Sequence, residues 1–151
     1  MPQITYEFAF RSLGTVPTTG TSPALCGFTY GIRMFVSDTI IWAGIDNRDS
    51  FTTLVSTGTG NYYNGAWNHA VATHDGKTFK LYINGVFNNS VDCAWYGVTR
   101  WPTNGAYIGR DNNNSMYFFY GDISVFRLYK VALTADQVAT NFRHIRGRYG
   151  L

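Results

Sequence analysis

The acidic residues are the side chains of this sequence that could break a glycosidic bond. Such hydrolysis uses two carboxyl groups, one as a general acid and the other as a nucleophile or base. Glu7 is the only glutamate, and no carboxylate lies two or four positions after it. A pair of aspartates that meets across a groove remains an alternative, but the pattern predicts that the chain is not an enzyme and has no catalytic residues.

The histidines and cysteines offer no nucleophile beside a base. His69 lies in a Trp-x-His segment, His74 flanks a turn, and His144 lies in the expected helix. None of them is close in sequence to Cys26 or Cys93, and no spacing typical of a zinc site is present. We therefore expect His69 to be structural and both cysteines to be buried free thiols.

Other side chains are suited to binding. A carbohydrate site needs exposed aromatic rings with amide or carboxylate neighbours. At least half of the aromatic residues that could form such a rim are expected in the core or at a subunit interface, and Trp42 and Trp67 are assigned to the core. The residues that could form a glycan-binding rim are Trp95, Tyr96, Trp101, Asn112, Asn113 and Tyr117.

Two Asx-rich segments make calcium the metal to consider. Residues 46–49 (DNRD) and 111–114 (DNNN) carry the oxygen ligands that calcium prefers. Both segments are also ordinary turn sequences. A calcium site is therefore an alternative, and no metal is predicted.

Alternating segments predict the strands that would position these groups. Ile4, Tyr6, Phe8 and Phe10 alternate with other residues, which is the period of a half-buried strand. Many short strands, one late helix and no alternation of strands with helices predict an all-β fold, an antiparallel β-sandwich with one short C-terminal helix. The other strands are expected at residues 28–36, 39–45, 50–57, 67–73, 78–83, 106–108 and 116–128.

The C-terminal helix has start and stop signals in the sequence. Thr134 is a suitable N-cap, and Gln137 three residues later completes a capping box. Gly147 is expected to end the helix in the left-handed conformation. Basic residues in the last turn complement the helix dipole.

Composition and charge limit the kinds of partner. A chain of 151 residues is near the usual size of one domain, so we expect a single domain over residues 1–151. The formal net charge is +3, with the positive excess in residues 127–151, and no nucleic-acid-binding motif is present, so no nucleic acid is expected as a partner. The sequence shows no apolar run of membrane-spanning length and no secretion signal. We expect no membrane partner and synthesis in a cytoplasm.

Several motifs together resemble a known family. Residues 65–72 (GAWNHAVA), 80–86 (KLYINGV) and 107–109 (YIG), followed by the helix signature, resemble laminin G-like domains of the concanavalin A-like jelly roll. The resemblance covers residues 65–138 and implies the sandwich fold. Two departures argue against calcium, because Asn84 and Ser124 stand where an acidic residue is frequent. The E-x-D-x-x-E arrangement of the related glucanases is also absent.

The C-terminal sequence resembles jelly-roll domains of tailed-bacteriophage structural proteins. This resemblance implies a non-enzymatic virion protein on the capsid surface, a decoration or cement protein that stabilises the shell by bridging subunits of the major capsid protein. The alternative is a lectin-like module, free or in a tail or fibre, that binds a surface glycan. A glycoside hydrolase is the least favoured interpretation.

The capsid hypothesis predicts particular contacts. Copies of the chain are expected to form closed rings, most simply a homotrimer. A strand that usually precedes the first one in the family is missing, so we expect an open sheet edge for a neighbour's chain. The predicted contact residues lie in a Thr-rich loop and in the basic C-terminal segment: Thr18, Thr19, Thr21, Arg143, Arg146, Arg148 and Tyr149.

Overall fold

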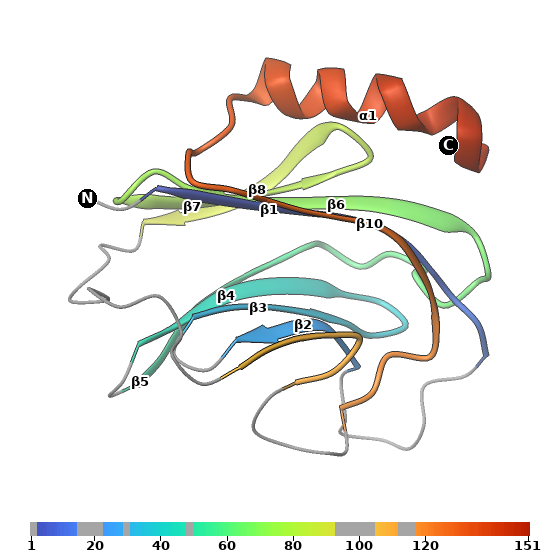
Figure 1. The fold of residues 1–151 in the computed structure, drawn as a ribbon, viewed down its shortest axis with the longest axis horizontal. Helices are drawn as coiled ribbons and strands as arrows, with labels where there is room; N and C mark the ends of the chain where they lie inside the picture. The colour runs from blue at the N-terminus through green and yellow to red at the C-terminus, as the bar shows by residue number, and fades with distance from the viewer. Residues whose placement is uncertain (1–2, 15–22, 29–30, 48–49, 93–104, 112–116) are drawn as a thin grey trace.

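The protein is a two-layer antiparallel β-sandwich with one helix lying outside it (Figure 1). The computed structural model describes residues 3–14, 23–28, 31–47, 50–92, 105–111 and 117–151, with residues 45–47 and 50–56 described by their backbone. The expected sandwich with one short C-terminal helix is confirmed. Its elements are β1 (Ile4–Ser12), β2 (Ala24–Phe28), β3 (Ile32–Val36), β4 (Ile41–Asn47), β5 (Ser50–Ser56), β6 (Trp67–His74), β7 (Thr78–Ile83), β8 (Val86–Asp92), β9 (Ala106–Ile108), β10 (Gly121–Tyr129) and α1 (Ala135–Tyr149).

The strands form two five-stranded sheets. Sheet A has the order β10-β1-β6-β7-β8, and sheet B has the order β5-β4-β3-β2-β9. β1 is paired on both sides, with β10 and β6. The first strand is therefore not at a sheet edge, and the edges of sheet A are β10 and β8.

The main core lies between the sheets and is rich in aromatic side chains. Tyr6, Phe8 and Phe10 of β1 are fully buried there, as are Met34 and Ile41 of sheet B. The rings of Phe8 and Phe126 pack with centroids 5.0 Å apart. Each large apolar side chain buried in this way contributes about 1.5–3 kcal/mol to folding.

A second, smaller core lies between sheet A and the helix. Val71 and Tyr82 of the sheet pack against Val138 of α1, with Leu133 beside them. The helix also covers the face of β1 opposite the main core, so Thr5, Glu7 and Ala9 are all 0% exposed. The prediction that this strand is half-buried is wrong, because the docking of α1 makes both of its faces internal.

The helix begins as predicted and ends later. Thr134 accepts a hydrogen bond from the Gln137 backbone amide, and the Gln137 side chain accepts one from the Thr134 amide. The left-handed residue that ends the helix is Gly150, with φ of 68°, and not Gly147. The additional turn brings Tyr149 against Trp67, with ring centroids 4.6 Å apart.

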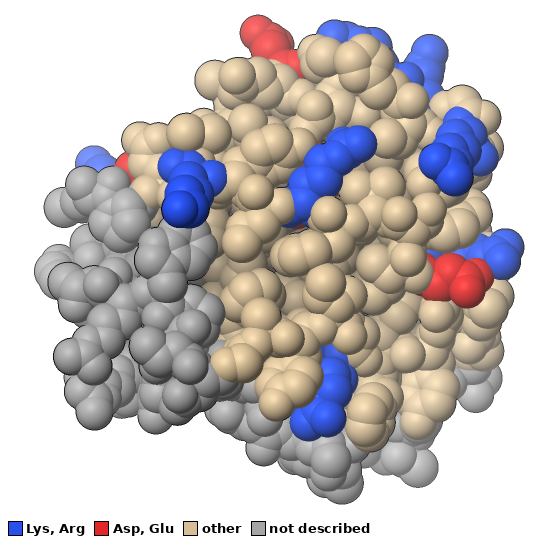
Figure 2. All heavy atoms as spheres, viewed as in Figure 1, with Lys and Arg blue, Asp and Glu red and all other residues tan. Residues whose placement is uncertain are grey.

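Other sequence predictions also need correction. Trp67 and Trp42 lie outside the main core, since Trp67 contacts the end of α1 and Trp42 packs on Phe35. The predicted strand 28–36 contains the end of β2 and all of β3, and β8 was not predicted. The face in Figure 2 is mostly uncharged, with scattered basic and a few acidic groups. No helix among the described residues is long and apolar enough to cross a membrane.

Candidate functional site

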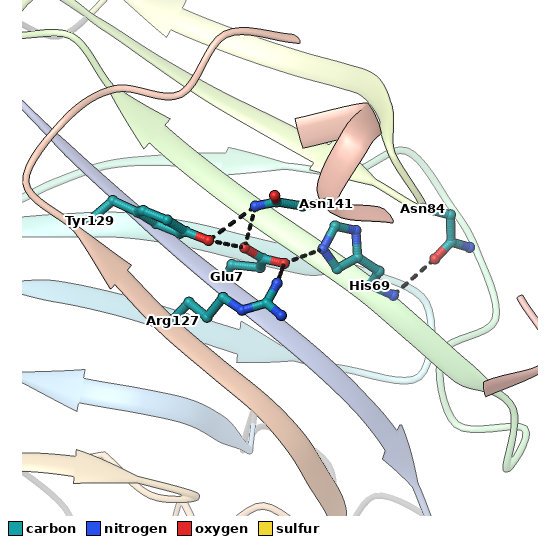
Figure 3. A network of polar contacts seen from close by, with 6 residues as sticks. All are labelled: Glu7, His69, Asn84, Arg127, Tyr129 and Asn141. Carbon is teal, nitrogen blue, oxygen red and sulfur yellow. Dashed lines mark hydrogen bonds and ion pairs between the residues drawn. The ribbon is translucent and has the colours of Figure 1, made fainter. Parts of the chain in front are cut away.

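Glu7 is the centre of a polar network beneath α1 (Figure 3). Its Oε1 accepts a hydrogen bond from Arg127 Nη1 at 2.8 Å and lies 3.1 Å from His69 Nε2. Its Oε2 accepts from the Tyr129 hydroxyl at 3.0 Å and from Asn141 Nδ2 at 2.8 Å. Both carboxylate oxygens are therefore occupied by groups from two strands, β6 and β10, and from the helix.

Strand register brings these groups together. Glu7 of β1 is directly opposite Arg127 of β10, and Thr5 is opposite Tyr129. His69 reaches the same face from β6, where its ring stacks on Phe142 of α1 with centroids 5.6 Å apart. The β6 backbone is held in turn by Asn84, whose side-chain oxygen accepts from the His69 amide at 2.8 Å.

The electrostatics of the network do not suit acid catalysis. Burial raises the pKa of the Glu7 carboxyl, but the hydrogen bond and charge of His69, followed by the charge of Arg127, outweigh this effect and lower the pKa below its usual value. A glycosidase acid needs a raised pKa to hold its proton. Glu7 is therefore suited to anchoring the helix on sheet A.

A shallow hollow of about 290 Å³ lies beside the network on the helix side. Asn141 and Tyr129 form its floor next to Glu7, and both side chains donate to that carboxylate. The hollow therefore opens onto groups that are already hydrogen-bonded. The other lining residues are Leu133, Asp136, Gln137 and Thr140.

A second group of side chains lies at the free edge of sheet B. Tyr107 of β9 and Phe118 are 38% and 43% exposed. The guanidinium of Arg110 lies 4.5 Å from the centre of the Tyr107 ring and 5.6 Å from that of Phe118. We name these three residues the β9 cluster, because they combine exposed rings with a cation at one place on the surface.

The turn after β9 positions the cluster. Gly109 has φ of 77°, which glycine adopts without strain and which reverses the chain toward Arg110. Its amide donates to the Leu25 carbonyl at 2.9 Å, and its carbonyl accepts from the Phe119 amide at 2.8 Å. The Gly109 backbone thus joins β2, the turn and the segment that carries Phe118.

Asp111 fixes the other end of the turn. Its carboxylate lies 3.6 Å from Arg33 Nε on β3, and both side chains are almost fully buried. The Asp111 carbonyl accepts a hydrogen bond from Arg110 Nε at 3.1 Å. The buried ion pair and this bond hold Arg110 against the two rings.

Comparison with known families agrees with this architecture. A family model described as the concanavalin A-like lectin/glucanases superfamily matches residues 5–139. The chain belongs to this superfamily. The expected laminin G-like, concanavalin A-like jelly roll is thereby confirmed, and no curated protein matches the chain at a significant level.

Solved structures share the superfamily fold at low sequence identity. One is a Bacteroides ovatus protein described as a candidate carbohydrate-binding protein, with TM-score 0.72 and 19% identity, covering 91% of this chain and 40% of that one. Another is the CBM40 domain of a Ruminococcus gnavus IT-sialidase bound to α2,3-sialyllactose, with TM-score 0.73 and 15% identity, covering 93% and 83%. A third is the binding domain of botulinum neurotoxin serotype G, with TM-score 0.75 and 13% identity, covering 95% and 36%.

The predicted glycan rim of this superfamily member lies largely outside the described residues, which exclude Trp95, Tyr96, Trp101, Asn112 and Asn113. Tyr117 is described. Its ring meets Phe35 edge-on with centroids 6.2 Å apart, and its carbonyl accepts from the Ala24 amide. Tyr117 is partly buried on the outer face of sheet B, close in sequence to Phe118 of the β9 cluster.

Some of the predicted protein-contact residues also lie outside the described part of the chain, and the others lie on α1. Thr18, Thr19 and Thr21 lie outside the described residues. Arg143, Arg146 and Arg148 are exposed on the last turns of α1. Tyr149 is partly buried, since its ring packs on Trp67 and its hydroxyl lies 2.6 Å from Ser124 Oγ.

The calcium alternative falls largely on residues outside the described part of the chain, which excludes residues 48–49 and 112–114. No group of three or more His, Cys, Asp or Glu side chains suited to a metal occurs in the part of the chain that the structure describes. Asp111, which belongs to one of the two Asx-rich segments, is paired with Arg33.

Sequence reasoning missed the β9 cluster. The signal was present in residues 93–121, which contain the aromatic residues Trp95, Tyr96, Trp101, Tyr107, Tyr117, Phe118, Phe119 and Tyr120. Such a density of rings in a short segment exceeds what one core-facing strand requires. The sequence does not tell which of these rings are exposed. Tyr107 and Phe118 are identified only by their exposure and by their position beside Arg110 in the structure.

Proposed function

We propose that this chain is a non-catalytic carbohydrate-binding domain that uses the β9 cluster. The observation that carries the proposal is the pair of exposed rings, Tyr107 and Phe118, held in place by Arg110 at a sheet edge. Aromatic rings contact the apolar faces of sugars and leave the hydroxyl groups for polar neighbours. A backbone braced by Gly109 and a buried ion pair supplies the rigid support that a binding surface needs.

The relatives in structure support this proposal. The domains reported above are described as carbohydrate-binding or as toxin binding domains, and one was solved with sialyllactose. A further botulinum neurotoxin binding domain was solved in complex with a sialylated ligand, SialylT, at TM-score 0.70 and 10% identity. Because this chain spans about 40% or less of several of these proteins, the likeness concerns one domain of each.

The state of Glu7 favours binding without catalysis. The only glutamate of the sequence is fully buried and makes four polar contacts, one of them to Asn141 of the helix. Its lowered pKa keeps it ionised, so it has no proton to give to a leaving group.

A glycan array followed by calorimetry on the best ligand tests the proposal. The double variant Tyr107→Ala/Phe118→Ala should lose about tenfold or more in affinity, since stacking and apolar contact are lost from two rings. Phe87→Ala is the matched control, because Phe87 is 52% exposed on β8 of the other sheet. Absence of any glycan binding by the wild-type chain, or equal binding by the double variant, would contradict the proposal.

The capsid decoration hypothesis remains the second candidate. The exposed Arg143, Arg146 and Arg148 on α1 would fit an acidic partner surface. Mass spectrometry of purified particles from the source would give the copy number relative to the major capsid protein. Hundreds of copies would support decoration, a few would indicate a tail or fibre, and none would exclude the virion.

A further inference from the structure

The charge around the β9 cluster is unbalanced. In residues 93–121 the only acidic residue is Asp111, while Arg100 and Arg110 are basic. Asp111 is already paired with Arg33 at 3.6 Å in a buried position. Among the described residues, no carboxylate forms an ion pair with Arg110, so its positive charge is uncompensated at this edge of the molecule.

The contrast with Arg11 is informative. Arg11 also lies over an aromatic ring, 5.3 Å from the centre of Trp67, but its Nε is 2.6 Å from a carboxylate oxygen of Asp122. The stacked Arg11 on sheet A thus has an acidic partner, whereas Arg110 on sheet B is stacked on rings without one among the described residues. The acidic group that would complete the Arg110 site is absent from the described chain.

The terminal N–H groups of the Arg110 guanidinium have no hydrogen-bond acceptor among the described residues. The faces of a guanidinium stack on rings, while its N–H groups donate in the plane of the group. Nε donates to the Asp111 carbonyl, and the two terminal nitrogens make no hydrogen bond with any described residue. Two parallel N–H groups on these nitrogens match the spacing of carboxylate oxygens.

We propose that Arg110 binds the carboxylate of an acidic sugar whose ring contacts Tyr107 and Phe118. This inference rests on the proposed carbohydrate-binding function and adds the class of ligand, a glycan bearing a carboxylic acid. The two rings lie against the guanidinium and provide apolar surface beside it, so one sugar residue can use both. Asp111 and Arg33 act as positioning residues, because they hold the turn and do not reach the ligand.

The test compares one glycan in two forms. The acidic glycan bound best on an array is measured by calorimetry against its carboxyl-reduced counterpart, which keeps the ring and loses the charge. The wild-type chain should prefer the acidic form by about 10- to 100-fold, the value of a charge-assisted bidentate hydrogen bond. Arg110→Gln should remove this preference, and Arg110→Lys should restore part of it.

A control separates recognition from folding. Arg11→Gln removes a stacked arginine on sheet A and should leave the preference for the acidic form intact. Equal affinity of the wild-type chain for both forms, an array on which only neutral glycans bind, or a preference that survives Arg110→Gln would overturn the inference while the carbohydrate-binding function stands. No binding to any glycan would overturn both.

Discussion

The side-chain amide of Asn141 donates a 2.8 Å hydrogen bond to the carboxylate of Glu7, although 134 residues separate them in the sequence. Asn141 lies on α1 and Glu7 on β1 of sheet A, so this contact fixes the helix over the sheet. The same amide nitrogen also donates to the Tyr129 hydroxyl at 3.0 Å. Glu7 is therefore the point at which the helix, β1, β6 and β10 are joined.

Replacing Glu7 with glutamine should destabilise the fold by about 2–4 kcal/mol. The amide group keeps the shape of the side chain, but its NH₂ group is a donor and would face groups that donate to the carboxylate in the wild type. His69 and Arg127 would also lose their negatively charged partner. Urea denaturation followed by circular dichroism measures the loss. Asp122→Asn is the control, since the Arg11–Asp122 pair is 40% and 46% exposed and should cost less than about 1 kcal/mol. Equal effects of the two variants would contradict the role of Glu7.

The stability should depend on pH through Glu7. Its pKa is lowered in the folded chain from the ordinary value of 4.5, so the unfolded chain binds the proton more tightly. The contribution of Glu7 is complete above pH 4.5 and is lost as pH falls below that value through the folded pKa. Urea midpoints measured against pH should show that the advantage of the wild-type chain over Glu7→Gln shrinks in this acid range. A constant difference between the two chains would contradict the prediction.

The sequence predicted the elements better than their docking. Alternation along β1 and the capping box at Thr134 are local signals, and both elements are present. β8 was missed because Asn88, Asn89 and Ser90 are poor strand formers, and the strand is stabilised by its ladder with β7. Local propensity does not report such pairing.

The polar network was beyond sequence reasoning for a different reason. Glu7 meets Arg127 only because β1 and β10 pair in one register, and Asn141 joins them only when α1 docks. A shift of one residue would turn Glu7 to the main core. The β9 cluster lies within twelve residues of sequence, but its exposure depends on how the turn at Gly109 packs.

Removing the Tyr149 ring should loosen the end of the helix. Tyr149→Ala loses the contact with Trp67 and should cost about 1–3 kcal/mol, with faster tryptic cleavage after Arg146 and Arg148. Tyr149→Phe keeps the ring contact and loses only the bond to Ser124, so it should cost less than about 1 kcal/mol. Cleavage of Tyr149→Ala at the wild-type rate would show that the ring does not hold the helix.

The exposed arginines at the end of α1 can be tested as a protein contact by substitution without disturbing the packing of the helix. Deletion of residues 143–151 would remove the buried Ile145 together with Tyr149, so the deleted chain should be less stable than the wild type. Replacing the exposed Arg143, Arg146 and Arg148 with glutamate leaves those contacts in place. The triple variant should keep the wild-type urea midpoint within about 1 kcal/mol and lose binding to an acidic partner, measured by cosedimentation with particles. Saturation of particles by the triple variant would exclude these arginines as the contact.

The Cys26 thiol should be inert in the folded chain. It is 0% exposed, and burial raises its pKa well above the usual value, so neither access nor the thiolate form is available. In a Cys93→Ser background, iodoacetamide should label Cys26 at a negligible rate in buffer and completely in urea, as measured by intact-mass spectrometry. The reciprocal Cys26→Ala variant reports on Cys93 separately. Labelling of native Cys26 at the rate of the unfolded thiol would mean that β2 opens readily, which the pairing of Cys26 with both Met34 and Ile108 argues against.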